Sequence, residues 1–181
     1  MLIPILAIVA VLVIGFLVFV STRPATFRYT RTLTIAAPAA ELFGQVNDLR
    51  KFQDWNPWAK VDPQCVMTYY GPATGVGSGY EWKGDRRVGE GAMTITESRP
   101  NEYVQARMEF RKPFAAKHTA EFSFTPEGGG RTVVSWSMFG DNNFMGKIMT
   151  TLVDCDKMVG GEFAKGLATL KAQAERQTAR L

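Results

Sequence analysis

KHTAEFSFTPEGGGRTVVSWSMFG, residues 117–140, holds two alternating runs of apolar and polar residues separated by EGGG. Alternation with a period of two is typical of a half-buried β-strand, and a short glycine-rich interval between two such runs favours a hairpin. One face of the predicted hairpin carries His118, Ala120, Phe122 and Phe124 from the first run and Val134, Trp136 and Met138 from the second. The stretch therefore predicts two antiparallel strands that share one aromatic and methionine-bearing face.

The same alternation recurs on the N-terminal side of this hairpin. The runs are FRYTRTLTI (27–35), CVMTYY (65–70), SGYEWKG (78–84), VGEGAMTITE (88–97) and EYVQARMEF (102–110). The last four are separated from each other and from the hairpin by GPATGVG, GDRR, SRPN and RKPFA, which contain the glycine and proline residues of turns. Consecutive strands from residue 64 onward are therefore expected to be linked by hairpins and to run antiparallel.

Helical patterns flank these strands on both sides. AAPAAELFGQVNDLRKFQDWNPW (36–58) predicts two short helices, the second ended by Pro57. Apolar residues then step by three or four from Phe144 to Ala174, which predicts one long helix over residues 144–175. Three glycines within that stretch, Gly160, Gly161 and Gly166, predict a bend or a close approach to the sheet. Helices on one side of an antiparallel sheet define an α+β fold.

The N-terminus carries a different signal. Residues 2–20, LIPILAIVAVLVIGFLVFV, contain no charged or polar side chain, and at about 1.5 Å per residue they match the roughly 30 Å hydrocarbon core of a bilayer. We interpret this run as an uncleaved, single-pass transmembrane anchor. A cleaved signal peptide is the alternative, but the run lacks a basic leading segment and a convincing small-residue cleavage site.

Basic residues follow the apolar run at Arg23, Arg28 and Arg31, so the positive-inside rule places the soluble domain in the cytoplasm. The predicted organisation is an anchor at 2–20, a linker at 21–26, a globular domain at 27–176 and a C-terminal tail at 177–181. The bilayer is thus one expected partner.

Composition argues against several other functions. The net charge is +4, but basic residues are interspersed with acidic ones, as in DLRK and KGDRR, so we expect no nucleic-acid partner. The sequence leaves the identity of any protein partner undecided.

Cys65 and Cys155 are interpreted as small buried hydrophobic residues rather than a disulfide framework. His118 is the only histidine, and no ligand pair has zinc-like spacing, so we expect no metal and no cofactor.

Several stretches, taken in order, carry a family resemblance. They are IAAPAAELFGQVNDLRKFQDWNPW, GVGSGYEWKG, RKPF, TVVSW and DKMVGGEFAKGLATLK. In this order the chain resembles the START-like (SRPBCC) superfamily, in particular its polyketide cyclase/dehydrase and lipid-transport branch, over residues 27–175. The resemblance implies a helix-grip fold, in which a curved seven-stranded antiparallel sheet wraps a long C-terminal helix around a deep hydrophobic cavity. The superfamily includes lipid carriers, hormone receptors, cyclases and chaperone cofactors, so the fold alone does not decide the function.

Residues on the aromatic sheet face are the candidates for ligand contact. They are Tyr80, Trp82, Met93, Met108, Phe110, His118, Phe122 and Trp136. His118 is also the only candidate for a catalytic acid or base, with a structural histidine near a strand end as the alternative. Phe52, Trp55 and Trp58 are interpreted as rings that close one end of the groove, and direct ligand contact is the alternative.

These observations predict a membrane-anchored binding protein for a hydrophobic small molecule, such as a lipid, a polyketide or an isoprenoid-like compound, rather than an enzyme. A cyclase- or dehydratase-like enzyme that uses the same cavity is one alternative. The other is an interaction module at the membrane, which would show an exposed apolar patch.

Overall fold

The computed structural model describes residues 2–178, and within them the side chains of residues 3–176. Its centre is a seven-stranded antiparallel sheet in the spatial order β1-β7-β6-β5-β4-β3-β2. The strands are β1 (Thr26–Ile35), β2 (Val66–Tyr70), β3 (Gly79–Lys83), β4 (Glu90–Arg99), β5 (Tyr103–Lys112), β6 (Ala116–Gly128) and β7 (Arg131–Asp141). From β2 to β7 each strand pairs with the next one along the chain, as the alternating runs and their turns predict.

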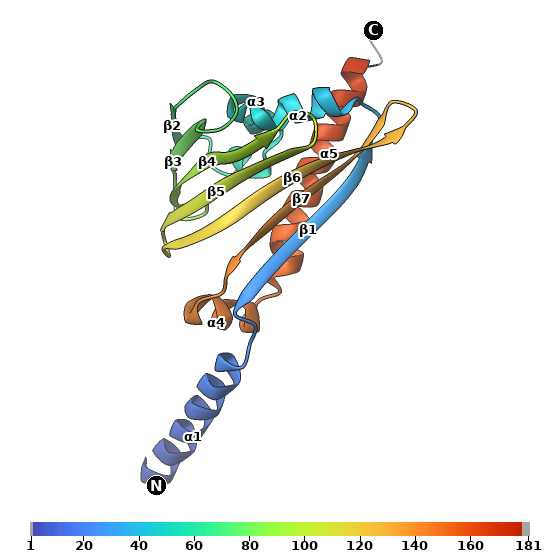
Figure 1. Cartoon of the computed structure of the whole chain (residues 1–181). Helices are drawn as coiled ribbons and strands as arrows, with labels where there is room; N and C mark the ends of the chain where they lie inside the picture. Colours follow the sequence, from blue (N-terminus) through green and yellow to red (C-terminus); the bar gives the residue numbers. More distant parts are fainter. Residues whose placement is uncertain (1, 179–181) are drawn as a thin grey trace.

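The helices are α1 (Leu2–Ser21), α2 (Ala39–Asn47), α3 (Leu49–Trp55), the short 3₁₀ helix η1 (Pro57–Lys60), α4 (Phe144–Leu152) and α5 (Cys155–Thr178). Most of the helices cover one face of this sheet, α4 lies at one end of it, and α1 projects from the domain (Figure 1). α5 lies along the sheet and contacts β1, β7 and the α2–η1 segment. The α+β class and the helix-grip arrangement are therefore confirmed.

The predicted single helix over residues 144–175 is wrong in one respect, because the chain leaves the helix between α4 and α5. Val153 is extended, at φ −131° and ψ 138°, and the backbone N–H of Lys157 donates to Oδ1 of Asp154 at 2.9 Å. A side-chain acceptor at this position satisfies a free N–H at a helix start. Asp154 thus begins a new helix, although the apolar stripe continues across the break.

Two of the three glycines of α5 lie where the helix closely approaches other parts of the chain. A Cβ on Gly160 would collide with the guanidinium of Arg31 from β1, and one on Gly166 would lie 2.8 Å from Cζ3 of Trp136. Gly161 has open space at the same point. Close approach to the sheet is therefore the better interpretation of the glycines at 160 and 166.

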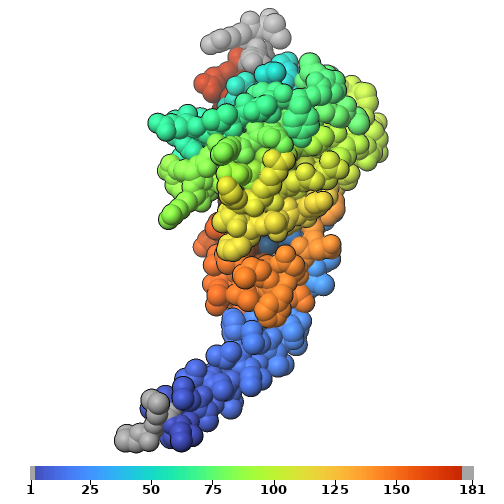
Figure 2. Space-filling view, turned by 90° about the vertical axis from the view of Figure 1, so that its left-hand side faces the viewer, coloured from blue at the N-terminus to red at the C-terminus, as the bar shows by residue number. Residues whose placement is uncertain are grey.

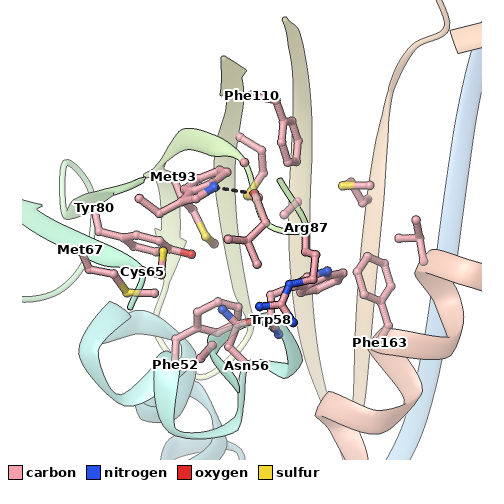
Figure 3. A pocket seen from close by; sticks show the side chains of 18 of the residues that line it. Phe52, Asn56, Trp58, Cys65, Met67, Tyr80, Arg87, Met93, Phe110 and Phe163 are labelled. Carbon is pink, nitrogen blue, oxygen red and sulfur yellow. Dashed lines mark hydrogen bonds between the residues drawn. The ribbon is translucent and has the colours of Figure 1, made fainter. Parts of the chain in front are cut away.

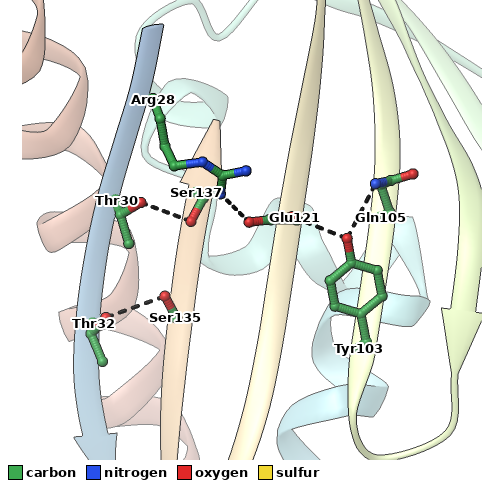
Figure 4. A network of polar contacts seen from close by, with 8 residues as sticks. All are labelled: Arg28, Thr30, Thr32, Tyr103, Gln105, Glu121, Ser135 and Ser137. Atoms are coloured by element: carbon green, nitrogen blue, oxygen red, sulfur yellow. Dashed lines mark hydrogen bonds and ion pairs between the residues drawn. The ribbon is translucent and has the colours of Figure 1, made fainter. Parts of the chain in front are cut away.

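A network of polar side chains lies on the face of the sheet that is turned away from the helices (Figure 4). Thr30 and Ser137 share a hydrogen bond of 2.9 Å between their hydroxyl oxygens, and the Tyr103 hydroxyl donates to Oε2 of Glu121 at 3.0 Å. Arg28 forms an ion pair with the same carboxylate. The apolar side chains of the alternating strands therefore point to the opposite, concave face, where the core lies.

Helix α1 stands away from this core (Figure 1). Residues Ile3–Ser21 have a mean hydropathy of 3.2, and 6% of the most apolar window is buried. By length and composition it is the one helix in the described part of the chain that could cross a membrane. The predicted linker lies between the end of α1 at Ser21 and the start of β1 at Thr26. Of the predicted tail, residues 177 and 178 continue α5, and 179–181 lie outside the described residues.

Candidate ligand-binding cavity

A cavity of about 330 Å³ lies between the concave face of the sheet and the α3–η1 and α5 helices (Figure 3). Residues of strands β2 to β7 line the sheet side of the cavity, and Val159 and Phe163 of α5 line the helix side. The opposite side is closed by Phe52, Asn56, Trp58 and Ala59 from α3, η1 and the turn between them. Binding sites for small molecules commonly have volumes of about 300–1,000 Å³, so this cavity has the size of a compact ligand.

Seven of the eight predicted ligand-contacting residues line this cavity, and strand alternation explains why. Residues two apart on one strand point the same way, and antiparallel pairing brings the faces of neighbouring strands together. Tyr80 thus lies beside Met93, and Phe122 beside Trp136. The seven are Tyr80, Trp82, Met93, Met108, Phe110, Phe122 and Trp136.

Trp136 is the centre of the aromatic wall. Its indole stacks on Phe163 with ring centroids 4.3 Å apart and an interplanar angle of 17°, and Phe122 follows at 5.1 Å. Phe52 and Trp58 meet the same indole edge-on at 5.9 and 6.1 Å. Stacked and edge-to-face ring pairs of this kind each contribute about 0.5–1.5 kcal/mol beyond the burial of their surface, so this wall is stabilised by ring contacts.

The stretch NDLRKFQDWNPW contributes both architecture and cavity wall. Trp55 is 1% exposed and does not line the cavity; its indole N–H donates to the carbonyl oxygen of Gln45 at 3.2 Å, which ties α3 to α2. Phe52 and Trp58 do line it. The architectural interpretation therefore fits Trp55, whereas Phe52 and Trp58 also present rings to the interior.

The polar groups at the cavity wall are few, and most are already hydrogen-bonded. Nε1 of Trp82 donates to the carbonyl oxygen of Val88 at 3.1 Å, and Nδ2 of Asn56 donates to Oε1 of Gln53 at 2.9 Å. The Tyr80 hydroxyl, like any tyrosine, is neutral at physiological pH and can donate a hydrogen bond, and burial raises its pKa further.

Two cationic side chains lie at the edge of the cavity, and each has an acidic partner. Arg87 pairs with Asp85 at 2.7 Å, and Lys112 pairs with Glu90 at 2.9 Å. The residues that line the cavity in the described structure include no aspartate or glutamate. The interior therefore favours an uncharged, apolar molecule, because burying an unpaired charge there would be costly.

His118, the eighth predicted residue, lies on the predicted sheet face but does not line this cavity. Its imidazole is held between Phe27 and Phe110, with ring centroids 4.8 and 5.4 Å away. It faces a second, more polar hollow of about 580 Å³ that Arg28 and Lys117 also line. Burial lowers the pKa of His118, and its buried Nδ1 has no hydrogen-bond partner among the side chains and backbone that the structure describes. The imidazole is thus neutral at pH 7, and it contacts Phe110, which lines the cavity, without lining the cavity itself.

Several lining residues were not predicted from the sequence. Phe163 and Val159 belong to the apolar stripe of α5, and the stripe does not show which of its members face a void. Met67 of β2 has the alternating phase that could have identified it, because it pairs with Trp82. The other unpredicted lining residues are Asn56, Ala59, Cys65, Arg87, Val88, Gly89, Lys112 and Pro113. Four further lining residues agree with the sequence expectations: Ala120 and Met138 belong to the aromatic sheet face, and Phe52 and Trp58 to the rings at the end of the groove, for which ligand contact is the alternative.

Fold and cavity together define a helix-grip domain with an internal apolar cavity. The chain belongs to the polyketide cyclase/dehydrase and lipid transport family, whose model matches residues 26–175. No curated protein sequence matches the chain significantly.

Solved structures support the same fold. A protein from Thermobifida fusca is 23% identical, with a TM-score of 0.61 over 84% of this chain and 95% of its own. Truncated norcoclaurine synthase from Thalictrum flavum is 13% identical, with a TM-score of 0.63 over 81% and 91%. The Aha1 dimer from Colwellia psychrerythraea is 16% identical, with a TM-score of 0.56 over 82% and 96%. At these identities the likeness extends to the fold alone.

Proposed function

We propose that this protein binds one hydrophobic small molecule, of the lipid, polyketide or isoprenoid-like class, in the cavity beneath the sheet, and that α1 anchors it in a membrane. The observation that carries the proposal is the wall itself: aromatic rings and methionine side chains surround about 330 Å³ of space. Methionine and aromatic side chains suit an apolar ligand, since they offer large, adaptable contact surfaces.

The size and the apolar wall of the cavity limit the size and the polarity of the ligand. Burial of apolar surface stabilises a complex by about 25 cal/mol per Å², so a molecule that fills this space gains most of its affinity from contact with the rings. The Tyr80 hydroxyl can add one hydrogen bond of about 0.5–1.5 kcal/mol. We therefore expect a mostly apolar compound with a single hydrogen-bond acceptor.

The cyclase- or dehydratase-like alternative would require an acid or a base at the cavity wall. His118 contacts Phe110 without lining the cavity, and the pKa of Tyr80, which burial raises further, lies far from neutrality. Arg87 and Lys112 at the edge are already paired with carboxylates. This arrangement favours a binder over an enzyme.

The anchor assignment rests on α1, whose exposed, apolar turns have the length that a bilayer requires. We propose a single-pass protein with its globular domain in the cytoplasm, because Arg23, Arg28 and Arg31 follow the apolar helix directly.

Native mass spectrometry of the full chain, purified from a membrane fraction in mild detergent, tests the binding proposal. We expect a population whose mass exceeds that of the polypeptide by one apolar compound, which organic extraction recovers. A protein that stays empty when it is purified from its native membrane, and after incubation with that membrane's lipid extract, would contradict the proposal.

A further inference from the structure

Helix α4 has an apolar face that the rest of the described chain leaves uncovered. None of its residues is buried, and Met145, Met149 and Leu152 are 47%, 41% and 67% exposed. Their spacing of four and then three residues places them on one side of the helix. Exposed apolar side chains follow in the turn after α4 and in the first part of α5. We call this surface the α4 patch: Phe144, Met145, Met149, Leu152, Val153 and Met158.

The opposite side of α4 is fixed to the end of α1 and to the linker. The ammonium group of Lys147 donates to the carbonyl oxygen of Ser21 at 3.1 Å. Just before α4, the backbone N–H of Asn142 donates to the carbonyl oxygen of Ala25 at 2.7 Å, and its side-chain amide donates to that of Pro24 at 3.3 Å. Val20, in the last turn of α1, is fully buried. Helix α4 is therefore held at the point where α1 ends.

This position determines what can cover the patch. Figures 1 and 2 both show α4 at the junction between α1 and the body of the domain. If α1 spans a bilayer, its last residue, Ser21, lies near the boundary between acyl chains and head groups. The α4 patch then lies at the same level. Amphipathic helices at that level bury their apolar side by about 5–10 Å.

The charges around the patch fit an interface with lipid head groups. Helix α4 contains one charged residue, Lys147, and no acidic one. Arg23 and Lys157 lie close in sequence to α1 and α4, and basic side chains are attracted to anionic lipids. Of the nearby acids, Asp154 caps the start of α5, and Asp156 pairs with Arg31 at 3.1 Å.

We propose that the α4 patch is a second membrane contact, which lies in the interface of the same bilayer that α1 crosses. The inference rests on the anchoring role of α1 given under Proposed function. Two contacts with the bilayer restrict the tilt of the domain more than the transmembrane helix alone. Met158 of the patch directly precedes Val159, which lines the cavity. The first part of α5 therefore contributes one residue to the membrane contact and the next one to the wall of the cavity.

The test uses the unmodified full chain in lipid nanodiscs that contain a phospholipid with a photoreactive diazirine near the head-group end of one acyl chain. After illumination, the cross-linked peptides are identified by mass spectrometry. We expect adducts on α1 and on the α4 patch, and none on the exposed turn at residues 127–131. Adducts on cavity residues would report bound lipid and are distinguishable, because no residue of the patch lines the cavity.

The outcomes separate the two proposals. Adducts on α1 without adducts on the patch would overturn the membrane role of α4 and leave the anchor intact. If the patch is protected from water but carries no lipid adduct, a second protein copy covers it, and the proposal is wrong. A chain without adducts on α1 refutes the anchor, and the α4 contact with it. Ligand binding in the cavity is measured separately and survives each of these results.

A matched pair of variants sharpens the test. Met149→Glu combined with Leu152→Glu places two carboxylates on the patch, and we expect its lipid adducts to fall about tenfold relative to those on α1. Val66→Glu makes the same chemical change at a side chain that is 62% exposed on edge strand β2. It should leave the adducts on α4 unchanged. An equal loss in both variants, or a loss in neither, would contradict the proposal.

Discussion

Gly166 of α5 lies so close to Trp136 of β7 that a side chain on the glycine would meet the indole, with a Cβ 2.8 Å from its Cζ3. The same Cβ would lie 3.2 Å from Cδ of Pro57. Helix, sheet and the α3–η1 turn therefore converge at one point beside the cavity. The absence of a side chain at Gly166 lets α5 approach near enough for Phe163 to stack on Trp136.

Gly166→Ala should therefore destabilise the domain, although alanine is the better helix former. Overpacking of a well-filled site costs about 1–3 kcal/mol, which exceeds the roughly 0.5–1 kcal/mol gained in helix propensity. Gly161→Ala, on the same helix with open space around it, is the control and should be neutral or stabilising. Denaturant unfolding of both variants checks this. An equal change in unfolding free energy would show that packing at Gly166 is unimportant.

The two tryptophans of NDLRKFQDWNPW should respond differently to truncation. Trp55→Ala removes a ring that is 1% exposed and ties α3 to α2, so we expect a loss of about 3–5 kcal/mol in unfolding free energy. Trp58 is partly exposed and lines the cavity. Compared with Trp55→Ala, Trp58→Ala should therefore lower the unfolding free energy less and the ligand affinity more. Thermal melts and ligand titrations of the two variants decide the assignment. Ligand loss confined to Trp55→Ala would reverse it.

Stability should depend on pH through His118. Because burial lowers the pKa of its imidazole in the folded protein, the unfolded chain binds the proton more tightly. The contribution of the neutral imidazole is complete above the ordinary histidine pKa of about 6.5 and is lost as the pH falls below that value toward the folded pKa. The unfolding free energy at about pH 5.5 and pH 7.5 should differ less in His118→Gln than in the parent. Identical differences in the two proteins would refute this linkage.

The substitution His118→Gln also distinguishes a binding protein from an enzyme. The imidazole contacts Phe110 and does not line the cavity, so His118→Gln should leave ligand affinity within about twofold. Calorimetric titration with the extracted ligand measures this. A general acid or base would instead give a loss of turnover by about 10²–10⁴ with little change in binding, and that result would favour the cyclase-like alternative.

Much of this structure follows from the alternation of the strands. A period of two fixes the side of the sheet to which each side chain points, so the residues on the concave face could be predicted. They include Tyr80, Met93, Met108, Phe122 and Trp136. His118 shows the limit of that reasoning. Alternation places it on the correct face, but whether it reaches the cavity depends on the positions of Phe27 and Phe110, which the pattern of its own strand does not contain.

The helices show a second limit. The apolar stripe continues from α4 into α5, so periodicity alone predicts one helix, and only Asp154 signals the new start. An N-cap residue is a weak signal beside such a long stripe. Likewise, the stripe did not reveal that Leu152 stays exposed while Phe163 is buried, because that depends on where α4 meets the end of α1.

The most direct test of the central claim fills the cavity. Ala120 is 4% exposed and lines it, so Ala120→Phe places a ring in the space that the ligand would occupy. Ala106→Val adds bulk at a fully buried position on neighbouring β5, outside the cavity wall, and serves as the control. Ligand occupancy of both variants is measured by native mass spectrometry, with circular dichroism to confirm folding. We predict that folded Ala120→Phe is empty while Ala106→Val keeps its ligand; full occupancy in folded Ala120→Phe would show that the molecule binds elsewhere.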